Sequence, residues 1–209
     1  MNVGLTGGIA CGKSTVARML EEKGAVLIDF DELAHAVQET EGAVWREIVR
    51  HFGEEILRED RTIDRTKLGE MVFADREKRE LLNRLVHPAI FEEWQRLLAE
   101  IRARHENAIV VSDIPLLIEA GLKEMVDVVL LVYIAPEEQI RRIMSRDGFS
   151  REEAETRLAA QMPIDEKLGW ADIVIRNQGS PDETRRAVSE VWVELNIREK
   201  RRREEIGRS

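Results

Sequence analysis

The chain has one cysteine, Cys11, and only four histidines among its 209 residues. A single cysteine cannot form a disulfide within the chain, which fits a protein that works in a reducing cytoplasm. Histidines, cysteines and carboxylates do not cluster at the spacing of zinc ligands, so a structural zinc site is not predicted. The fold is therefore expected to depend on a hydrophobic core alone.

Long apolar runs and an excess of basic residues are also missing. The longest apolar run, residues 128–135, is far shorter than the roughly 20 residues that span a bilayer, and the chain starts in a strand pattern without a signal peptide. Lys and Arg number 32 against 41 Asp and Glu, which gives a net charge of −9. Because nucleic-acid phosphates need a basic face, we expect no nucleic-acid partner. The short apolar runs and the single cysteine lead us to expect no membrane partner and a cytoplasmic location.

The strongest motif is G-G-I-A-C-G-K-S-T at residues 7–15, between an apolar run and a helical pattern. Two glycines followed by Lys and Ser match the P-loop, whose backbone N–H groups and helix N-terminus cradle the phosphates of a nucleoside triphosphate. Lys13 would reach the β- and γ-phosphates, and the Ser14 hydroxyl would coordinate Mg²⁺. Chance coincidence is the alternative, which the flanking strand and helix disfavour. The predicted nucleotide contacts in this loop are Gly7, Gly8, Ile9, Ala10, Cys11, Gly12, Lys13, Ser14 and Thr15.

Apolar runs predict five buried strands. The first, at residues 3–5, leads into the P-loop; Gly24 ends the next helix, and residues 25–28 complete a βαβ unit with parallel strands. The others lie at residues 108–111, 126–134 and 172–175. We predict an α/β fold with a five-stranded parallel sheet flanked by helices, whose ligand chemistry gathers at the carboxyl ends of the strands.

The second and third strands are separated by a helical insertion. Helical patterns occupy residues 33–37, 44–52 and 67–73, and a long one starts near Asp75. We expect Pro88 to interrupt this last helix, because proline has no N–H and disfavours helical geometry at His87. An insertion on the ligand edge could form the wall of a second substrate's site.

Two more helices are predicted after the fourth strand. Pro136 opens the first, Asp147 and Gly148 break it, and S-R-E-E at residues 150–153 is a capping box for the second. As an antiparallel pair they suit a mobile lid, whereas the charged end of the chain reads as a solvated helix end without a function. The predicted organisation is a nucleotide-binding core (residues 1–31, 106–135 and 170–197), an acceptor-binding region (32–105), a lid (136–169) and a charged tail (198–209).

Two carboxylates at strand ends are candidates for chemistry. Asp31 follows the second strand and could accept a proton from an acceptor hydroxyl, with Asp29 in support. Alternatively, Asp31 is the N-cap of the next helix and Asp29 orients Lys13. Asp113 ends the third strand, where a carboxylate can hold the water shell of Mg²⁺; a helix cap or a substrate contact is equally open.

Arg142 and Arg146 lie four residues apart on one face of the first lid helix. Their guanidinium groups could stabilise charge on a transferring phosphoryl group, although such helix faces are often simply solvated. Cys11 has two readings as well: a reactive thiol with a lowered pKa in an accessible loop at a helix N-terminus, or an inert small residue. His87 beside Pro88 would ordinarily be a structural hydrogen-bonding residue.

The motifs in combination resemble the dephospho-CoA kinase family. They are G-L-T-G-G-I at residues 4–9 with the rest of the P-loop, D-F-D at 29–31, L-V-H-P at 85–88 and D-I-P-L-L at 113–117, then Gln139, Arg142, Arg146, Gln161, Lys167, A-D at 171–172 and N-Q-G at 177–179. The resemblance covers about residues 2–180 and is far more specific than the P-loop alone. It departs at Cys11, often Ser or Gly in the family, and at Ile118, often Phe.

This resemblance implies a P-loop kinase fold and ATP-dependent phosphorylation of the ribose 3′-hydroxyl of dephospho-CoA, the last step of coenzyme A synthesis, with Mg²⁺. Asp31 would be the general base, and Lys13, Arg142 and Arg146 would hold phosphates. Asn177 and Gly179 would lie by the ATP adenine. The implied acceptor contacts are Thr6, Asp31, His87, Pro88, Asp113 and Leu116.

Two other functions share these features. A nucleoside or nucleoside-monophosphate kinase would have the same P-loop and lid, and it would be separated by its stabilisation by AMP, CMP or adenosine. A non-catalytic nucleotide-binding switch would bind ADP without turnover that depends on an acceptor.

Overall fold

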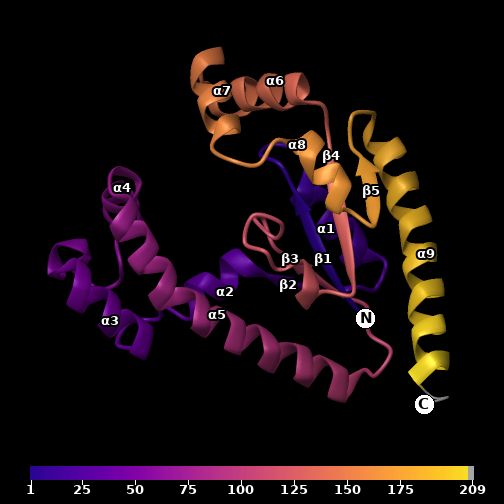
Figure 1. Ribbon diagram of the computed structural model, residues 1–209, viewed down its shortest axis with the longest axis horizontal. Coiled ribbons are helices and arrows are strands. Elements are labelled where there is room, and N and C mark those ends of the chain that lie inside the picture. Colours follow the sequence, from indigo (N-terminus) through magenta and orange to yellow (C-terminus); the bar gives the residue numbers. More distant parts are fainter. Residues whose placement is uncertain (207–209) are drawn as a thin grey trace. The chain divides into compact units, whose positions relative to one another are not determined.

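The computed structural model describes residues 1–206 and divides into two compact units (Figure 1). One, the sheet unit, comprises Met1–Ile28 together with the chain from His105 onward. The other, the helical unit, comprises Asp29–Arg104. Each unit is described by itself below.

The centre of the sheet unit is a five-stranded sheet in the order β2-β3-β1-β4-β5. Its strands are β1 (Asn2–Gly7), β2 (Val26–Asp29), β3 (Val110–Asp113), β4 (Val128–Tyr133) and β5 (Ile173–Arg176). In the parallel register Leu5 of β1 lies opposite Asp113 of β3 and Leu130 of β4. The predicted parallel sheet is confirmed, and the loop after β1 leaves the same edge at which β3 ends.

Alternating side chains pack the two faces of this sheet. Leu130 and Val132 share a core with α1 (Lys13–Glu22) and α9 (Pro181–Ile206), and α9 runs alongside β5 (Figure 1). Leu131 and Tyr133 point the other way, toward α8 (Ile164–Lys167). Each fully buried leucine or isoleucine stabilises the fold by roughly 1.5–3 kcal/mol. Packing on both faces explains why β4 is apolar along its whole length.

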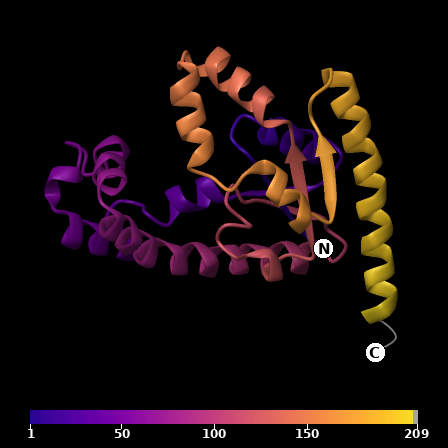
Figure 2. The same cartoon turned by 45° about the horizontal axis from the view of Figure 1, so that its top comes forward.

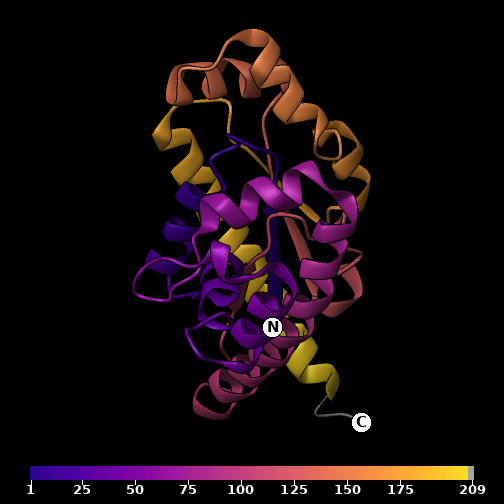
Figure 3. The same ribbon diagram turned by 90° about the vertical axis from the view of Figure 1, so that its left-hand side faces the viewer.

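The segment after β4 contains α6 (Pro136–Asp147) and α7 (Arg151–Ala159), which pack against each other through Ile143 and Ala154 (Figure 3). Gly148 ends α6 in the left-handed region, with φ 72°, and Ser150 forms a capping box at the start of α7. The predicted breaker and cap are confirmed. That this pair acts as a mobile lid stays a prediction.

The helical unit is built on one long helix. Its members are α2 (Phe30–Ala36), α3 (Ala43–Phe52), α4 (Arg65–Ala74) and α5 (Arg76–Arg104), and the three shorter helices each contact α5 (Figure 2). Phe30 of α2 meets Trp94 of α5 edge to face, with ring centroids 5.0 Å apart. Single 3₁₀ turns occur here at Glu54–Ile56, and in the sheet unit at Lys123–Met125 and Leu168–Trp170.

The prediction that Pro88 interrupts the long helix is wrong, because Pro88 lies inside α5, a single helix of 29 residues. A proline inside a helix costs about 3 kcal/mol. Side chains that recur every four residues on one face of α5 are buried, and at roughly 1.5–3 kcal/mol each they outweigh that cost: Val86, Ile90, Trp94 and Leu98. Pro88 itself is exposed, where water can bond the carbonyl group that loses its partner.

The interpretation of the tail as wholly solvated is also wrong at one residue. Helix α9 continues without a break through Ile206, and Glu199 on it is buried. Its carboxylate accepts hydrogen bonds from Arg202 and pairs with the amino group of Met1 at 3.1 Å. Residues 207–209 of the predicted tail lie outside the described residues.

Candidate functional site

The P-loop connects β1 to α1, and its charged side chains meet at the carboxyl edge of the sheet. Lys13 is the first residue of α1, and its Nζ donates to Asp113 Oδ1 at the end of β3. Ser14 follows in the first turn and is exposed. A lysine charge, a hydroxyl and the open N-terminus of a ten-residue helix therefore lie together, as phosphate binding requires.

Two glycines of this loop cannot be replaced without a clash. A Cβ atom on Gly7 would meet Cys11 Sγ and lie 2.9 Å from the Val132 carbonyl oxygen. Gly12 has a φ of +85°, and its Cβ would meet the side-chain amide of Asn177. The loop thus needs glycine for close backbone approach at one end and for a left-handed turn at the other.

The side chain of Cys11 is buried beneath the loop, with 1% of the residue's surface exposed. Burial raises the pKa of its thiol, against a weaker opposite effect of the Lys13 N–H and the Lys13 and Lys167 charges. The interpretation of Cys11 as an accessible thiol with a lowered pKa is therefore wrong. The position of Cys11 in the sequence predicts a helix dipole that favours its thiolate form. It does not predict the desolvation of the sulfur, which outweighs the dipole.

Side chains from α6, from the turn between α7 and α8, from α8 and from the end of β5 bind the loop from outside. Gln139 Nε2 donates to the Ile9 carbonyl at 2.7 Å, and Asn177 Nδ2 donates to the Cys11 carbonyl at 2.8 Å. Gln161 Oε1 accepts the Ile9 N–H at 3.1 Å. The fully buried Lys167 approaches the Gly7 carbonyl at 3.4 Å, and its Nζ pairs with Glu119 at 2.7 Å.

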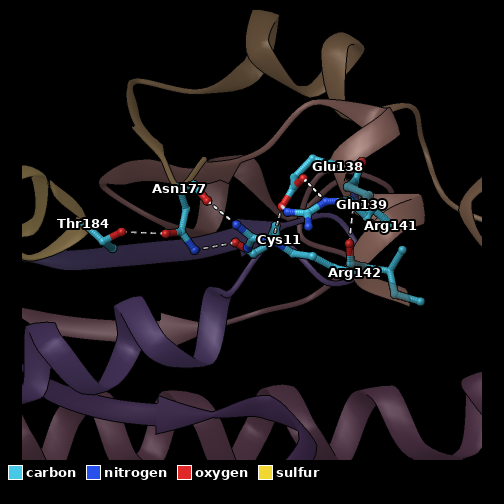
Figure 4. Close-up of polar contacts among 8 residues, drawn as sticks. Cys11, Glu138, Gln139, Arg141, Arg142, Asn177 and Thr184 are labelled. Atoms are coloured by element: carbon cyan, nitrogen blue, oxygen red, sulfur yellow. Dashed lines mark hydrogen bonds and ion pairs between the residues drawn. The ribbon is translucent and has the colours of Figure 1, made fainter. Parts of the chain in front are cut away.

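Arg142 reaches the same region from α6 (Figure 4). Its guanidinium donates to the Asn177 carbonyl at 2.7 Å and pairs with Glu138 at 2.8 Å. Hydrogen bonds from Arg141 and Arg142 lower the pKa of Glu138 to about 2, so this carboxylate stays charged. Arg146 is turned elsewhere: it is exposed and pairs with Asp147 at 2.8 Å.

The remaining predicted residues of the sheet unit differ in accessibility. Thr6 is fully buried, and its hydroxyl donates to the Pro115 carbonyl at 3.1 Å. Leu116, in the segment after β3, is 47% exposed. Gly179 is exposed in the turn before α9, where a Cβ would meet the Glu183 carboxylate.

In the helical unit, Asp29 and Asp31 have separate structural positions. Asp29 is the N-cap of α2, and its Oδ1 accepts the N–H groups of Asp31 at 2.8 Å and Glu32 at 3.2 Å. Asp31 lies in the first turn and is exposed. The alternative that Asp31 is the N-cap is therefore wrong, because the Asp29 carboxylate makes the capping hydrogen bonds.

His87 and its neighbours line a cavity of about 280 Å³ within the helical unit. His87 is exposed and packs edge to face on Phe91 at 6.2 Å between centroids, and Pro88 is exposed beside it. Arg65 also lines the cavity, and its guanidinium donates to Gln38 Oε1 at 3.1 Å. Within residues 1–206 Arg65 has no carboxylate partner, so its charge is available to an anion.

A family model described as dephospho-CoA kinase matches residues 1–183 of this chain. The chain belongs to the dephospho-CoA kinase family. A dephospho-CoA kinase from Syntrophus aciditrophicus is 54% identical over 209 residues, covering 100% of this chain and 89% of the relative.

Solved structures agree with this membership. A Thermus thermophilus protein is 39% identical with a TM-score of 0.77, covering 93% of this chain and 97% of the other. The dephospho-CoA kinase from Campylobacter jejuni is 31% identical with a TM-score of 0.73, covering 94% and 97%. The predicted family and the P-loop kinase fold are confirmed.

Sequence reasoning on this dephospho-CoA kinase family member missed several contacts. The sequence singles out Gln139, Gln161 and Lys167 only through the family resemblance, and it gives no signal for Arg65. A lone glutamine or a charged residue on a helix has no local pattern that reveals a long-range partner. Their partners lie 27 to 160 positions away in the chain, so only the fold brings them together.

Two structural findings concern ions and membranes. Across residues 1–206, three or more His, Cys, Asp or Glu side chains nowhere converge as a metal cage would require. Over that same part of the chain, helices that combine the length and the apolar character needed to cross a bilayer are absent.

Proposed function

We propose that this chain transfers the γ-phosphoryl group of ATP to the ribose 3′-hydroxyl of dephospho-CoA, giving coenzyme A and ADP. The observation that carries the proposal is the family match over residues 1–183. The P-loop of the chain also leads into a helix N-terminus, as phosphate binding requires. This transferase acts in coenzyme A synthesis. We place it in the cytoplasm, with ATP and dephospho-CoA as substrates and no nucleic-acid or membrane partner.

The residues divide the work by charge and position. The P-loop, Gly7 to Thr15, binds the ATP phosphates. Lys13 and Arg142 neutralise charge on the transferring phosphoryl group. Arg146 leaves its ion pair with Asp147 and binds phosphate beside them. Asn177 and Gly179 lie by the adenine. Asp31 accepts the proton of the 3′-hydroxyl. The acceptor contacts are Thr6, Asp31, His87, Pro88, Asp113 and Leu116.

Mg²⁺ fits the residues present. The Ser14 hydroxyl is the kind of oxygen ligand that Mg²⁺ takes in proteins, and it is exposed beside Lys13. Because Mg²⁺ in such enzymes keeps waters and binds substrate phosphates, it needs no cage of protein carboxylates. The Ser14 hydroxyl would hold the ion, which would supply positive charge that neutralises the phosphates of the nucleotide.

A coupled assay of ADP release tests the function directly. We expect release that depends on dephospho-CoA and little release with water, AMP, CMP or adenosine in its place. Thermal stabilisation by the same acceptors gives an independent ranking. Preferred turnover of AMP or CMP would favour a nucleoside-monophosphate kinase, and ADP binding without turnover on any acceptor would favour a nucleotide switch.

Arg142→Ala should lower kcat about 10²-fold and change the KM for dephospho-CoA little, because its charge acts on the transferring phosphoryl group. Arg141→Ala is the matched control, since Arg141 pairs with the same Glu138 at 2.7 Å but is exposed. Steady-state kinetics on both variants separate the loss of the shared ion pair from the loss of phosphate contact. Preserved kcat with lost dephospho-CoA affinity would instead assign α6 to the acceptor site.

Arg65→Met should raise the KM for dephospho-CoA about tenfold and leave the KM for ATP near the wild-type value. The diphosphate of dephospho-CoA is the anion that an arginine without a carboxylate partner can take, and a hydrogen-bonded charge of this kind contributes about 1.5 kcal/mol or more. Arg79→Met, which removes an exposed arginine of α5, is the control. An unchanged KM for dephospho-CoA would remove Arg65 from the acceptor site.

A further inference from the structure

Two alternate carbonyl groups of the P-loop are bound from outside by buried side-chain amides. Gln139, which is 1% exposed, donates to the Ile9 carbonyl at 2.7 Å, and Asn177, which is 9% exposed, donates to the Cys11 carbonyl at 2.8 Å. Figure 4 shows the second bond in a chain that runs from Thr184 through Asn177 to Cys11. The two donors come from different elements, so the loop is held at two separate points.

A carbonyl that points outward turns the next N–H inward. In a planar trans peptide the C=O of one residue and the N–H of the following residue point in opposite directions. Fixing the Ile9 and Cys11 carbonyls therefore fixes the N–H groups of Ala10 and Gly12. Within residues 1–206, neither of these N–H groups has a hydrogen-bond partner, as expected for donors that await a phosphate.

The residue between the two bound carbonyls has a strained backbone. Ala10 has a φ of 59°, in the left-handed region, which costs a residue other than glycine about 1–2 kcal/mol. Such a conformation persists only where the surroundings hold it. Released from the Gln139 bond, the Ile9–Ala10 peptide could rotate, relieve Ala10 and turn its N–H out of the cradle.

The two amide side chains differ in the other polar contacts that they make. Asn177 is oriented by Thr184, whose hydroxyl donates to Asn177 Oδ1 at 2.7 Å. Gln139 Oε1 has no hydrogen-bond partner among the described residues, so the bond from its Nε2 to Ile9 is the polar contact that holds it. A buried amide that leaves its oxygen unpaired is costly, which indicates that the bond to Ile9 has a purpose beyond stability.

We propose that Gln139 and Asn177 are positioning residues that turn the Ala10 and Gly12 N–H groups into the cradle, and so set the affinity for the phosphates of the nucleotide. The proposal rests on the proposed function, because it requires that the P-loop bind a nucleotide. For Gln139, which is not one of the proposed adenine contacts, it predicts an effect on the phosphate contacts and none on the nucleoside.

Gln139→Met tests the proposal by separating phosphate from nucleoside. The methionine fills the same space and cannot donate, so calorimetric affinity for ADP should fall about tenfold while affinity for adenosine stays within twofold. Gln139→Leu, measured alongside, gives the same comparison with a smaller side chain. Ala10→Gly in the Gln139→Met background should recover part of the ADP affinity, because glycine adopts the left-handed region without strain.

Asn2→Leu is the matched control for a lost buried amide. Asn2 is 2% exposed at the start of β1, the opposite end of the strand from the P-loop, and its Nδ2 donates to the Met125 carbonyl at 3.3 Å. This variant should lower the melting temperature and keep the wild-type ratio of ADP to adenosine affinity. A merely structural role for Gln139 predicts the same behaviour for both variants.

The outcomes are distinct. If the wild type does not prefer ADP to adenosine, the proposed function fails, and this inference with it. If the wild type does and the Gln139 variants keep its ratio, or lose both affinities equally, only the positioning role is overturned. A phosphate-specific loss that Ala10→Gly partly reverses supports the role.

Discussion

Lys13→Met should lower turnover about 10³-fold and abolish the stabilisation of the fold by ATP. The ammonium group lies at the N-terminus of α1 and pairs with Asp113 at the carboxyl edge of the sheet, so it is fixed before the phosphates arrive. Charge held in place in this way acts on the transition state without reorganisation, and loss of one such group costs about 10²–10³-fold or more. Methionine keeps the apolar stem and removes the charge alone.

The effect of losing the Lys13–Asp113 ion pair on stability must be distinguished from the effect on turnover, because both side chains are mostly buried, at 17% and 6% exposure. Removing one member of a buried pair destabilises a protein by about 3–5 kcal/mol. Lys13→Met with Asp113→Asn should regain part of the melting temperature and none of the turnover. Lys23→Met, at the exposed C-terminal end of the same helix, should match wild type in both. ATP stabilisation that survives in Lys13→Met would contradict the P-loop assignment.

The sheet could be predicted from the sequence because its inner strands, β1, β3 and β4, are buried along their whole length and its edge strands, β2 and β5, are still mostly apolar. The expected strand at residues 126–134 is observed as Val128–Tyr133, and the one at 172–175 as Ile173–Arg176. The small offset at each start has a physical cause. Asp127 and Asp172 do not extend the strands, because their carboxylates accept the N–H groups of Asn2 and Val129.

Predictions failed where a long-range contact outweighs a local preference. Pro88 should end a helix by its own chemistry, but buried neighbours on the same face of α5 hold the helix through it. Cys11 has the helix N-terminus that lowers a thiol pKa, yet the fold buries the sulfur and raises it. Glu199 belongs to a charged run that reads as solvated, but the fold buries it, and its charge is paired with the amino group of Met1.

At the candidate site, too, the residues of a local motif could be predicted and those that depend on long-range contacts could not. The glycines, Lys13 and Ser14 form one local motif, so their positions followed from the sequence. The amides that hold the loop did not, because Gln139 and Asn177 come from elements more than a hundred positions later in the chain. A sequence motif therefore predicts the residues that we propose touch the phosphates, whereas the side chains that bind the loop from outside are seen only in the fold.

Asp31→Asn should lower turnover at saturating substrates by about 10²-fold or more and leave ATP affinity near the wild-type value, as the loss of a general base does. The structure favours a clean result, because Asp29, and not Asp31, caps α2. Asparagine keeps the shape of the exposed side chain and removes its ability to take a proton. The melting temperature should therefore change little, since no hydrogen bond of the helix start is lost.

Glu32→Gln is the matched control, because Glu32 is the next carboxylate in the same first turn, is also exposed and likewise gives its N–H to Asp29. It removes the same charge from the same helix end, where a carboxylate contributes about 0.3–1 kcal/mol through the helix dipole. Glu32→Gln should keep near wild-type turnover, so a loss confined to Asp31→Asn isolates proton transfer. Single-turnover measurements of the phosphoryl transfer step make the comparison independent of product release. Equal turnover in the two variants would show that Asp31 is one more surface carboxylate of α2, and the search for the base would move to Asp113.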